Sequence, residues 1–502
     1  MKLVKSSIKT YLAFLCLLFF CLSCTDKNSN NSNERKDQYI EPIDFDLDKI
    51  KKRGSLIAVV DNSTTSYFIY RGRPMGYEYE LLTRLCKSLE IDLEVVLTPN
   101  LEEAFAMLNR GDADVMAYHL TITRERSQRV SFTEPHNTVR QVLVQRKPEQ
   151  WRKLKQHQID ASLIRSPIDL AGQTVYVRKG SSFAERLYNL SDEIGADIIV
   201  EEIEGDVDTE SLIKQVANGE IDYTIADEDV AMINASYNPN LDVTTDISFP
   251  QQIAWAVRKN SKNLKNAIDK WLLSMKREPD FYVIYDKYFR SSKNQRIRVA
   301  SDYSSISKGS ISPYDDVIMK AAQELDIDWL LLASIIFQES KFDPQVESWA
   351  GAKGLMQLTN NIIEEYGVED VYDPEENIWA GVKHLKWLME YWGEEIKNPE
   401  DRIQFILGSY NVGQGHVRDA MKLAEKYKEE TNAWDVIAKY LLLKSKSEYY
   451  TDPVVQYGYC RGTEPVNYVK QIMNRYNQYK LFFSDEKLTA DSTVIIEASL
   501  IH

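Results

Sequence analysis

One glutamate in the last third of the chain stands where a buried helix is expected to end. The run 329–339 follows Asp328, a residue type that caps helices well, and carries apolar residues at helical spacing. Glu339 comes four and three residues after Ile335 and Ile336, so its carboxyl should emerge from the buried face. Burial disfavours the ionised carboxyl and raises its pKa. A carboxylic acid that stays partly protonated near neutral pH can protonate a glycosidic leaving group.

A single buried glutamate is more often a paired core charge than a catalytic acid. The residues around Glu339 reverse this expectation, because they resemble the lytic transglycosylase family related to the soluble lytic enzyme. Four segments resemble its motifs in order: 334–344 with the Glu339-Ser340 pair, 351–358 (GAKGLMQL), 377–385 (NIWAGVKHL) and 408–413 (GSYNVG). A fifth segment, 464–469, resembles the family's ETxxYV motif, with Pro465 replacing Thr.

The resemblance implies a mainly α, lysozyme-like module that cleaves the β-1,4 bond between N-acetylmuramic acid and N-acetylglucosamine. Glu339 would protonate the bridging oxygen and then act as base toward the muramoyl 6-hydroxyl, which closes a 1,6-anhydro ring. Since the nucleophile belongs to the substrate, the second carboxylate of ordinary glycosidases is unnecessary. The resemblance also assigns residues that position the sugar and the carboxyl: Ser340, Met356, Gln357, Tyr410, Asn411 and Tyr468.

Upstream of this region, short β-rich runs alternate with helical patterns from residue 54 to about residue 290. Strands are expected near 56–60, 93–97, 114–117, 142–145, 174–177, 198–200, 222–226 and 253–257. Alternation of this kind predicts an α/β unit, and the strand count fits two lobes.

Several segments of this unit resemble the periplasmic solute-binding proteins of the polar amino-acid type. They are 76–81 (GYEYEL), 120–126 (LTITRER) with 130–135 (VSFTEP), 170–175 with 179–182, and 219–227. The resemblance implies that the chain crosses to the second lobe near Arg146 and returns near Ile253. The whole fold is then an α/β two-lobed periplasmic-binding-protein module followed by a mainly α lysozyme-like module.

The same resemblance implies a site for a zwitterion between the lobes. Arg126 would bind a ligand α-carboxylate, Thr121 and Ser182 would add hydroxyl hydrogen bonds, and Asp227 would meet an α-ammonium. An arginine at this spacing can also cap or pair locally, so ligand binding remains an alternative to a structural role. The entry loop 61–70 lacks the usual proline and leaves Tyr67 or Phe68 as candidates for an aromatic wall. The ligand could be a small amino acid or a muropeptide-like molecule, and the sequence does not decide between them.

The N-terminus has the pattern of a bacterial lipoprotein signal. Three lysines precede an apolar run at 11–22, which is too short to span a bilayer, and Leu22-Ser23-Cys24 follows. This ending resembles a lipobox, although Cys21 stands where leucine is usual. Lipidation of Cys24 would anchor the protein to the outer membrane, facing the periplasm, with a polar leash at 24–45. Plain secretion is the alternative.

Composition excludes several classes. The chain has 502 residues, 43% of them hydrophobic, and a net charge of -15, which disfavours a nucleic-acid partner. Its six histidines are scattered. Cys16 and Cys21 would leave with the signal and Cys24 would be acylated, so only Cys86 and Cys460 remain, and we expect no metal site and no cofactor.

The order of these parts resembles the membrane-bound lytic murein transglycosylase F family. We expect a signal at 1–23, the leash, a solute-binding module at 46–292, a linker at 293–311, a transglycosylase module at 312–484 and a tail at 485–502. Lobe 1 is about 46–145 plus 250–292, and lobe 2 is 146–249. The expected partner is the peptidoglycan strand, cleaved under possible control by a ligand. The alternatives are a receptor that holds glycan without cleaving it, and a muramidase that gives hydrolytic products.

Overall fold

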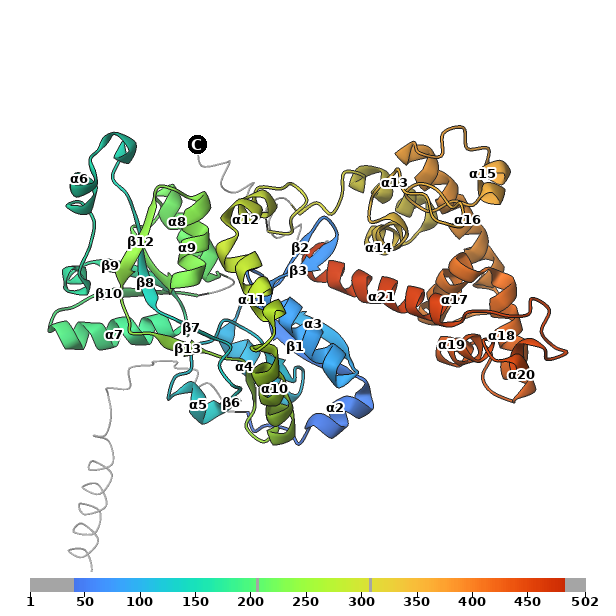
Figure 1. Ribbon diagram of the computed structural model, residues 1–502, viewed down its shortest axis with the longest axis horizontal. Helices are drawn as coiled ribbons and strands as arrows, with labels where there is room; N and C mark the ends of the chain where they lie inside the picture. Colours follow the sequence, from blue (N-terminus) through green and yellow to red (C-terminus); the bar gives the residue numbers. More distant parts are fainter. Residues whose placement is uncertain (1–39, 205–206, 307–308, 484–502) are drawn as a thin grey trace, which may run out of the picture. The chain divides into compact units, whose positions relative to one another are not determined.

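The computed structural model describes residues 40–204, 207–306 and 309–483 (Figure 1). From Pro42 onward the described residues form one compact unit. The expected signal, Cys24, most of the leash and the tail lie outside the described residues. None of the helices in the described ranges is long and apolar enough to cross a bilayer.

The first lobe is a five-stranded sheet with the order β4-β1-β5-β14-β6. Strands β4 and β5 run parallel to β1, and β14 runs antiparallel to β5 and β6. Apolar residues on both sides of β1 are buried because helices cover the sheet. The elements of this lobe are α2 (Leu47–Arg53), β1 (Ser55–Val60), β2 (Phe68–Tyr70), β3 (Arg73–Met75), α3 (Tyr77–Leu89), β4 (Asp92–Leu97), α4 (Leu101–Arg110), β5 (Val115–Met116), α5 (Arg126–Arg129), β6 (Val130–Phe132), β14 (Ala256–Arg258), α10 (Lys262–Met275) and α11 (Pro279–Tyr285).

The second lobe has its own sheet, with the order β10-β9-β11-β8-β12. Its elements are β8 (Gln141–Arg146), α6 (Gln156–Asp160), β9 (Thr174–Arg178), α7 (Ser182–Ile194), β10 (Ile199–Ile203), α8 (Thr209–Asn218), β11 (Tyr223–Asp227), α9 (Glu228–Tyr237) and β12 (Leu241–Asp246). Antiparallel pairing places β8 between β11 and β12.

The crossing between the lobes comes earlier than the sequence predicts. The two connecting segments pair as a short ribbon of β7 (Asn137–Val139) with β13 (Gln251–Ile253). The return near Ile253 agrees with the prediction, but the outward crossing precedes β8 and does not lie near Arg146. Strand β8 is buried along most of its length, and such a strand can join either sheet without any change in its hydrophobic pattern.

Two further segments differ from the sequence prediction. The single strand expected at 253–257 is interrupted at Trp255, whose indole nitrogen donates to Glu78 Oε2 at 2.6 Å. The expected linker contains a helix, α12 (Ser292–Val299), which follows the π-helical turn η3 (Asp286–Arg290). A polar contact holds this helix in place, because the buried Gln295 amide donates to Thr64 O at 2.8 Å. A helix that is held by polar contacts shows no apolar periodicity in its sequence, so the pattern does not predict it.

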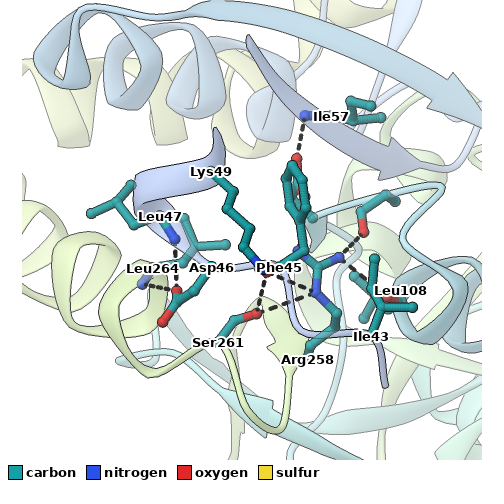
Figure 2. A network of polar contacts seen from close by, with 12 residues as sticks. Ile43, Phe45, Asp46, Leu47, Lys49, Ile57, Leu108, Arg258, Ser261 and Leu264 are labelled. Atoms are coloured by element: carbon teal, nitrogen blue, oxygen red, sulfur yellow. Dashed lines mark hydrogen bonds and ion pairs between the residues drawn. The ribbon is translucent and has the colours of Figure 1, made fainter. Parts of the chain in front are cut away.

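A buried arginine fastens the start of the described chain to the first lobe (Figure 2). Arg258 is fully buried and donates to Phe45 O at 2.7 Å and to Asp114 Oδ1 at 2.8 Å. Asp46 accepts hydrogen bonds from the backbone nitrogens of Leu47 and Leu264, both at 2.8 Å, so one carboxylate joins the starts of α2 and α10. These contacts hold Phe45 and Asp46 against the first lobe.

The last third is helical, as the sequence predicts. Its helices are α13 (Asp315–Leu325), α14 (Trp329–Ser340), α15 (Asn360–Tyr366), α16 (Pro374–Gly393), α17 (Pro399–Val412), α18 (Gln414–Lys426), α19 (Trp434–Leu443), α20 (Ser447–Tyr450) and α21 (Thr463–Phe483). Helix α14 is buried along almost its whole length and packs against α21 and α13. A buried helix at the centre of the module is a rigid support for a side chain at its end.

Candidate functional site

Glu339 lies in the last turn of α14. The helix starts where Asp328 Oδ1 accepts from Leu330 N at 2.9 Å, which is the expected cap. It ends at Ser340, and the next two residues, Lys341 and Phe342, both lie in the left-handed region with φ of 56° and 63°. The chain therefore turns away directly after the glutamate, and the carboxyl is left at the end of a buried helix.

A tyrosine from another helix contacts this carboxyl. Tyr468 on α21 donates its hydroxyl to Glu339 Oε1 at 2.5 Å. Burial raises the pKa of Glu339 to about 7, although the Tyr468 hydrogen bond opposes the rise. Among the described residues no second carboxylate contributes to this pKa shift. The carboxyl is therefore buried at the end of the helix, where the apolar spacing of the sequence predicts it.

The loop that carries Met356 and Gln357 is held from α16 and α17. Asn377 is fully buried, accepts from Met356 N at 2.8 Å and donates to Val371 O at 2.7 Å. Tyr410 on α17 donates its hydroxyl to Met356 O at 2.9 Å. Gln357 has a positive φ of 50° and donates to Val346 O at 3.1 Å. Sequence motifs contained Asn377, but only the fold reveals that it fixes this loop.

The remaining residues assigned to the site differ in how they face it. The Met356 side chain is fully buried, and a Cβ built on Gly381 would lie 2.3 Å from its sulfur, so the side chain is a core element. Ser340 is buried and donates to Ile336 O at 3.1 Å within its own helix. Asn411 is half-buried beside Tyr410 at the end of α17. Glu339, Tyr410 and Tyr468 thus form the centre, with Ser340, Met356, Gln357 and Asn411 around it.

A second candidate site lies between the two lobes of the solute-binding module. Thr121, Arg126, Ser182 and Asp227, all four predicted from the sequence, line one cavity of about 80 Å³. The first two come from lobe 1 and the last two from lobe 2, on the start of α7 and the end of β11. Separate motifs therefore meet in space as the prediction requires.

The lobes contact each other across this cavity. Arg126 donates to Gly180 O and to Thr121 O, both at 3.0 Å. Thr64 donates through its backbone nitrogen and its hydroxyl to Glu210, at 3.0 and 2.8 Å. The cavity is closed on these sides in the structure.

Sequence reasoning missed a histidine at this cavity. His119 lines it and lies 3.3 Å from Asp229 Oδ1, 3.9 Å from Asp227 Oδ2 and 4.0 Å from Glu78 Oε1. These carboxylates outweigh desolvation and raise the pKa of His119 to about 10. A polar residue between the apolar Tyr118 and Leu120 was the available signal in the sequence. Its partners come from distant segments, and no local pattern reveals them.

The aromatic part of the cavity is also different from the one predicted. Tyr118, Phe183 and Phe289 line it, whereas Tyr67 and Phe68 are fully buried and do not. The entry loop instead contributes small polar residues, such as Ser63 and Thr65. Within residues 40–204, 207–306 and 309–483 there is no cluster of metal-ligating side chains.

Comparisons with known proteins agree with both modules. Residues 56–291 match the family of bacterial extracellular solute-binding proteins, family 3, and residues 316–433 match the transglycosylase SLT domain. An ancestral amino acid-binding protein, a precursor of cyclohexadienyl dehydratase, is 25% identical, with a TM-score of 0.40 over 48% of this chain and 98% of its own. The fold and the two sites define a solute-binding module joined to a lytic transglycosylase module.

Relatives that match most of the chain identify the family. A membrane-bound lytic murein transglycosylase F of Desulfosudis oleivorans is 37% identical over 86% of this chain and 91% of its own length. One of Saccharophagus degradans is 32% identical over 85% of this chain and 82% of its own. The chain belongs to the membrane-bound lytic murein transglycosylase F family.

Proposed function

We propose that this protein is a peptidoglycan lytic transglycosylase in which Glu339 is both the acid and the base. The observation that carries the proposal is the buried Glu339 carboxyl, with its pKa near 7 and its hydrogen bond from Tyr468. A group with this pKa is available in both protonation states near neutral pH, as a two-step acid and base role requires.

In the first step Glu339 gives its proton to the oxygen between N-acetylmuramic acid and N-acetylglucosamine, and the bond from that oxygen to muramoyl C1 breaks. In the second step the Glu339 carboxylate takes the proton of the muramoyl 6-hydroxyl, and the 6-oxygen forms a bond to muramoyl C1. The products are a free N-acetylglucosamine end and a 1,6-anhydromuramoyl end. Glu339 is protonated again, and no water is consumed. The single-carboxylate environment fits this route, since hydrolysing glycosidases use a pair of carboxyls.

The surrounding residues would position the sugar and the acid. Tyr468 orients the Glu339 carboxyl, and Tyr410 fixes the loop backbone at Met356. Burial raises the pKa of both tyrosines well above 10, so their hydroxyls remain donors at any physiological pH. Gln357 and Asn411 would line the sugar path next to this centre, and Ser340 would help to position the carboxyl from within α14.

Product analysis of digested peptidoglycan tests the reaction. The wild-type protein should release anhydromuropeptides, and Glu339→Gln should reduce their release at least about 100-fold, because general acid and base catalysis is worth roughly that much or more. Glu390→Gln, at an exposed position on α16, is the matched control and should remain active. Mass spectrometry distinguishes the outcomes: reducing ends that depend on Glu339 mean a muramidase, and no release by the wild type favours a glycan receptor.

The solute-binding module is proposed to bind a small ligand through Thr121, Arg126, Ser182 and Asp227. A bidentate guanidinium and a carboxylate are the partners that a zwitterionic amino acid requires. The cavity that these four residues line, with contacts between the lobes on both sides, supports this role. Loss of amino-acid binding in Arg126→Ala, measured by calorimetry, is the expected result.

Contacts between the modules support control of the glycan site by that ligand. The turn between β2 and β3 places Gly72 against the transglycosylase module, where a Cβ on it would lie 2.7 Å from Phe337, Phe342 and Tyr479 side-chain atoms. Tyr479 donates its hydroxyl to Gly72 O at 2.8 Å, and Tyr67 packs on Phe482 with ring centroids 5.3 Å apart. The entry loop at the ligand cavity and the helix that carries Tyr468 are therefore in contact.

Cys24 is proposed to carry a lipid that anchors the protein to the outer membrane, facing the periplasm. The lipobox-like sequence before Cys24 supports this, and the relatives are named as membrane-bound. Cys24→Ala should move the protein from the membrane fraction to the soluble fraction. Density-gradient separation of the wild type decides between the inner and the outer membrane.

A further inference from the structure

Two exposed tyrosines lie on the loop that leads into α21, the helix of Tyr468. Tyr457 is 59% exposed and Tyr459 is 57% exposed, and both belong to the segment between α20 and α21. A large aromatic ring that is left in water forgoes the free energy that its burial would give. Two such rings side by side in the sequence, on an ordered loop, are typical of a binding surface.

A buried ion pair holds this loop in place. Asp419 on α18 accepts hydrogen bonds from the backbone nitrogens of Gln456 and Tyr457, both at 2.8 Å. Lys444 donates to the same carboxylate at 2.8 Å, and the side chains of Asp419 and Lys444 are both fully buried. Burying an ion pair costs desolvation free energy and is not in itself a source of stability. Here the pair fixes the backbone at Tyr457, and a binding surface needs this kind of support.

The Tyr457 ring lies flat on the start of α18. A Cβ built on Gly415 would lie 2.4 Å from Cζ, 2.5 Å from Cε2 and 2.6 Å from Cε1 of Tyr457. Because these three ring atoms are almost equally far away, Gly415 contacts the face of the ring and not its edge. A side chain at position 415 would displace the ring. The glycine therefore supports one face of the ring, and the other face is left for a ligand.

Tyr459 is supported by a neighbouring tyrosine. Its ring and that of Tyr450 are 5.8 Å apart between centroids, with an angle of 81° between their planes. Edge-to-face contacts of this kind are favourable for aromatic pairs. Gly458, with a positive φ of 66°, turns the chain between the two exposed tyrosines. Both rings are thus held by neighbours and remain open to solvent.

These rings lie close to the catalytic centre along the chain in two directions. Asn411, near the end of α17, and Gly415, in the first turn of α18, are four residues apart, so at most about 14 Å separates their Cα atoms. The Tyr457 ring rests on Gly415. Tyr459 precedes the start of α21 by four residues, and that helix carries Tyr468. The exposed rings therefore continue the surface that begins at Asn411.

We infer that Tyr457 and Tyr459 form a platform on which the glycan strand stacks beyond the bond that is cleaved. The C–H groups of a pyranose ring form an apolar face that packs on an aromatic ring. Two neutral rings offer apolar faces but no charged partner, so a sugar strand fits them better than a stem peptide with its carboxylates. The platform adds affinity for the strand and takes no part in proton transfer. The inference rests on the proposed function, because it extends the glycan site around Glu339.

Binding of an uncharged oligomer tests the platform without cleavage. The probe is the β-1,4-linked hexamer of N-acetylglucosamine, titrated by calorimetry into the full-length Glu339→Gln protein in detergent. Tyr457→Ala and Tyr459→Ala should each weaken binding about tenfold, because each removes a ring that buries apolar sugar surface. Tyr457→Phe and Tyr459→Phe keep the ring and should bind within about twofold of the parent protein.

Tyr427→Ala is the matched control. Tyr427 is 48% exposed in the same module and stacks on Tyr440, with ring centroids 5.8 Å apart. It follows the last turn of α18, about 18 Å along the helix from Gly415. Hexamer binding should be unchanged in this variant. An equal loss of binding in Tyr427→Ala would mean a general effect of removing tyrosines and would overturn the platform.

The other outcomes separate the platform from the reaction. Hexamer binding that is absent in the parent, or unchanged in Tyr457→Ala and Tyr459→Ala, overturns the platform and leaves the reaction at Glu339 standing. Weaker binding of a purified stem peptide in these variants, with unchanged hexamer binding, also overturns the inference and assigns the surface to the peptide. Hexamer binding that depends on both rings supports the platform even where the wild type releases no muropeptides, and the proposed reaction alone then fails.

Discussion

Two opposing influences act on the Glu339 carboxyl. Burial raises its pKa and the hydrogen bond from Tyr468, which stabilises the carboxylate, lowers it; burial has the larger effect, and the resulting pKa is about 7. Bond cleavage needs the protonated form. The rate of anhydromuropeptide release should therefore fall about tenfold for each pH unit above about 7. Timed digestion of peptidoglycan across neutral and alkaline pH measures this alkaline limb of the pH–rate profile. A rate that keeps rising far above pH 7 contradicts the role of Glu339 as the acid.

Tyr468→Phe should displace the same limb. Loss of the hydroxyl removes the hydrogen bond that stabilises the Glu339 carboxylate, so the pKa should rise and the alkaline limb should move up by about one pH unit. The estimate follows from about 1.5 kcal/mol for a hydrogen bond to a charged group. Tyr476→Phe is the control, since Tyr476 lies on the same helix and donates to Asp328 at 2.9 Å. An unchanged limb in Tyr468→Phe would mean that the hydroxyl does not act on the carboxyl.

Two glycines in one loop test how the fold positions Gln357. Gly351 and Gly354 both have positive φ, 82° and 77°, but only Gly354 lacks space, because its Cβ would lie 2.1 Å from Asn377 Nδ2. Gly351→Ala should cost about 1 kcal/mol from backbone strain alone. Gly354→Ala should cost on the order of 3 kcal/mol, since it also displaces the Asn377 hydrogen bonds, and it should lose most activity. Thermal unfolding and product release compare the pair, and equal effects would refute the role of Asn377.

The sequence predicted those elements that are determined by residues close to one another in the chain. Helix α14 and its Asp328 cap follow from apolar spacing and a capping carboxylate, and Glu339 follows from its place in that pattern. Features fixed by distant partners were not predicted correctly. The strand expected at 142–145 is present as β8, but it pairs in the second lobe. Helix α12, which is held by Gln295 on Thr64 O, was not predicted. The role of His119 likewise depends on carboxylates from three other segments.

At the scale of the whole molecule, one helix contacts both the catalytic glutamate and the solute-binding module. Helix α21 donates to Glu339 through Tyr468 and to Gly72 of the solute-binding module through Tyr479. A movement of the entry loop on ligand binding could therefore be transmitted to Glu339 through the packed side chains of α21. A ligand can shift the equilibrium between two arrangements only by the difference in its affinity for them, so the expected effect is a coupling free energy of about 1–3 kcal/mol.

Tyr479→Phe should weaken this coupling. The substitution removes one buried hydrogen bond between the modules, worth about 1 kcal/mol, so the ratio of product release with and without a saturating ligand of the solute-binding module should move toward one by up to about fivefold. Lys470→Ala is the control, because its 2.6 Å ion pair with Asp92 also joins the modules but is exposed and contributes little. A ratio equal to that of the wild type in Tyr479→Phe, with a clear ligand response in both, would exclude this contact from the route.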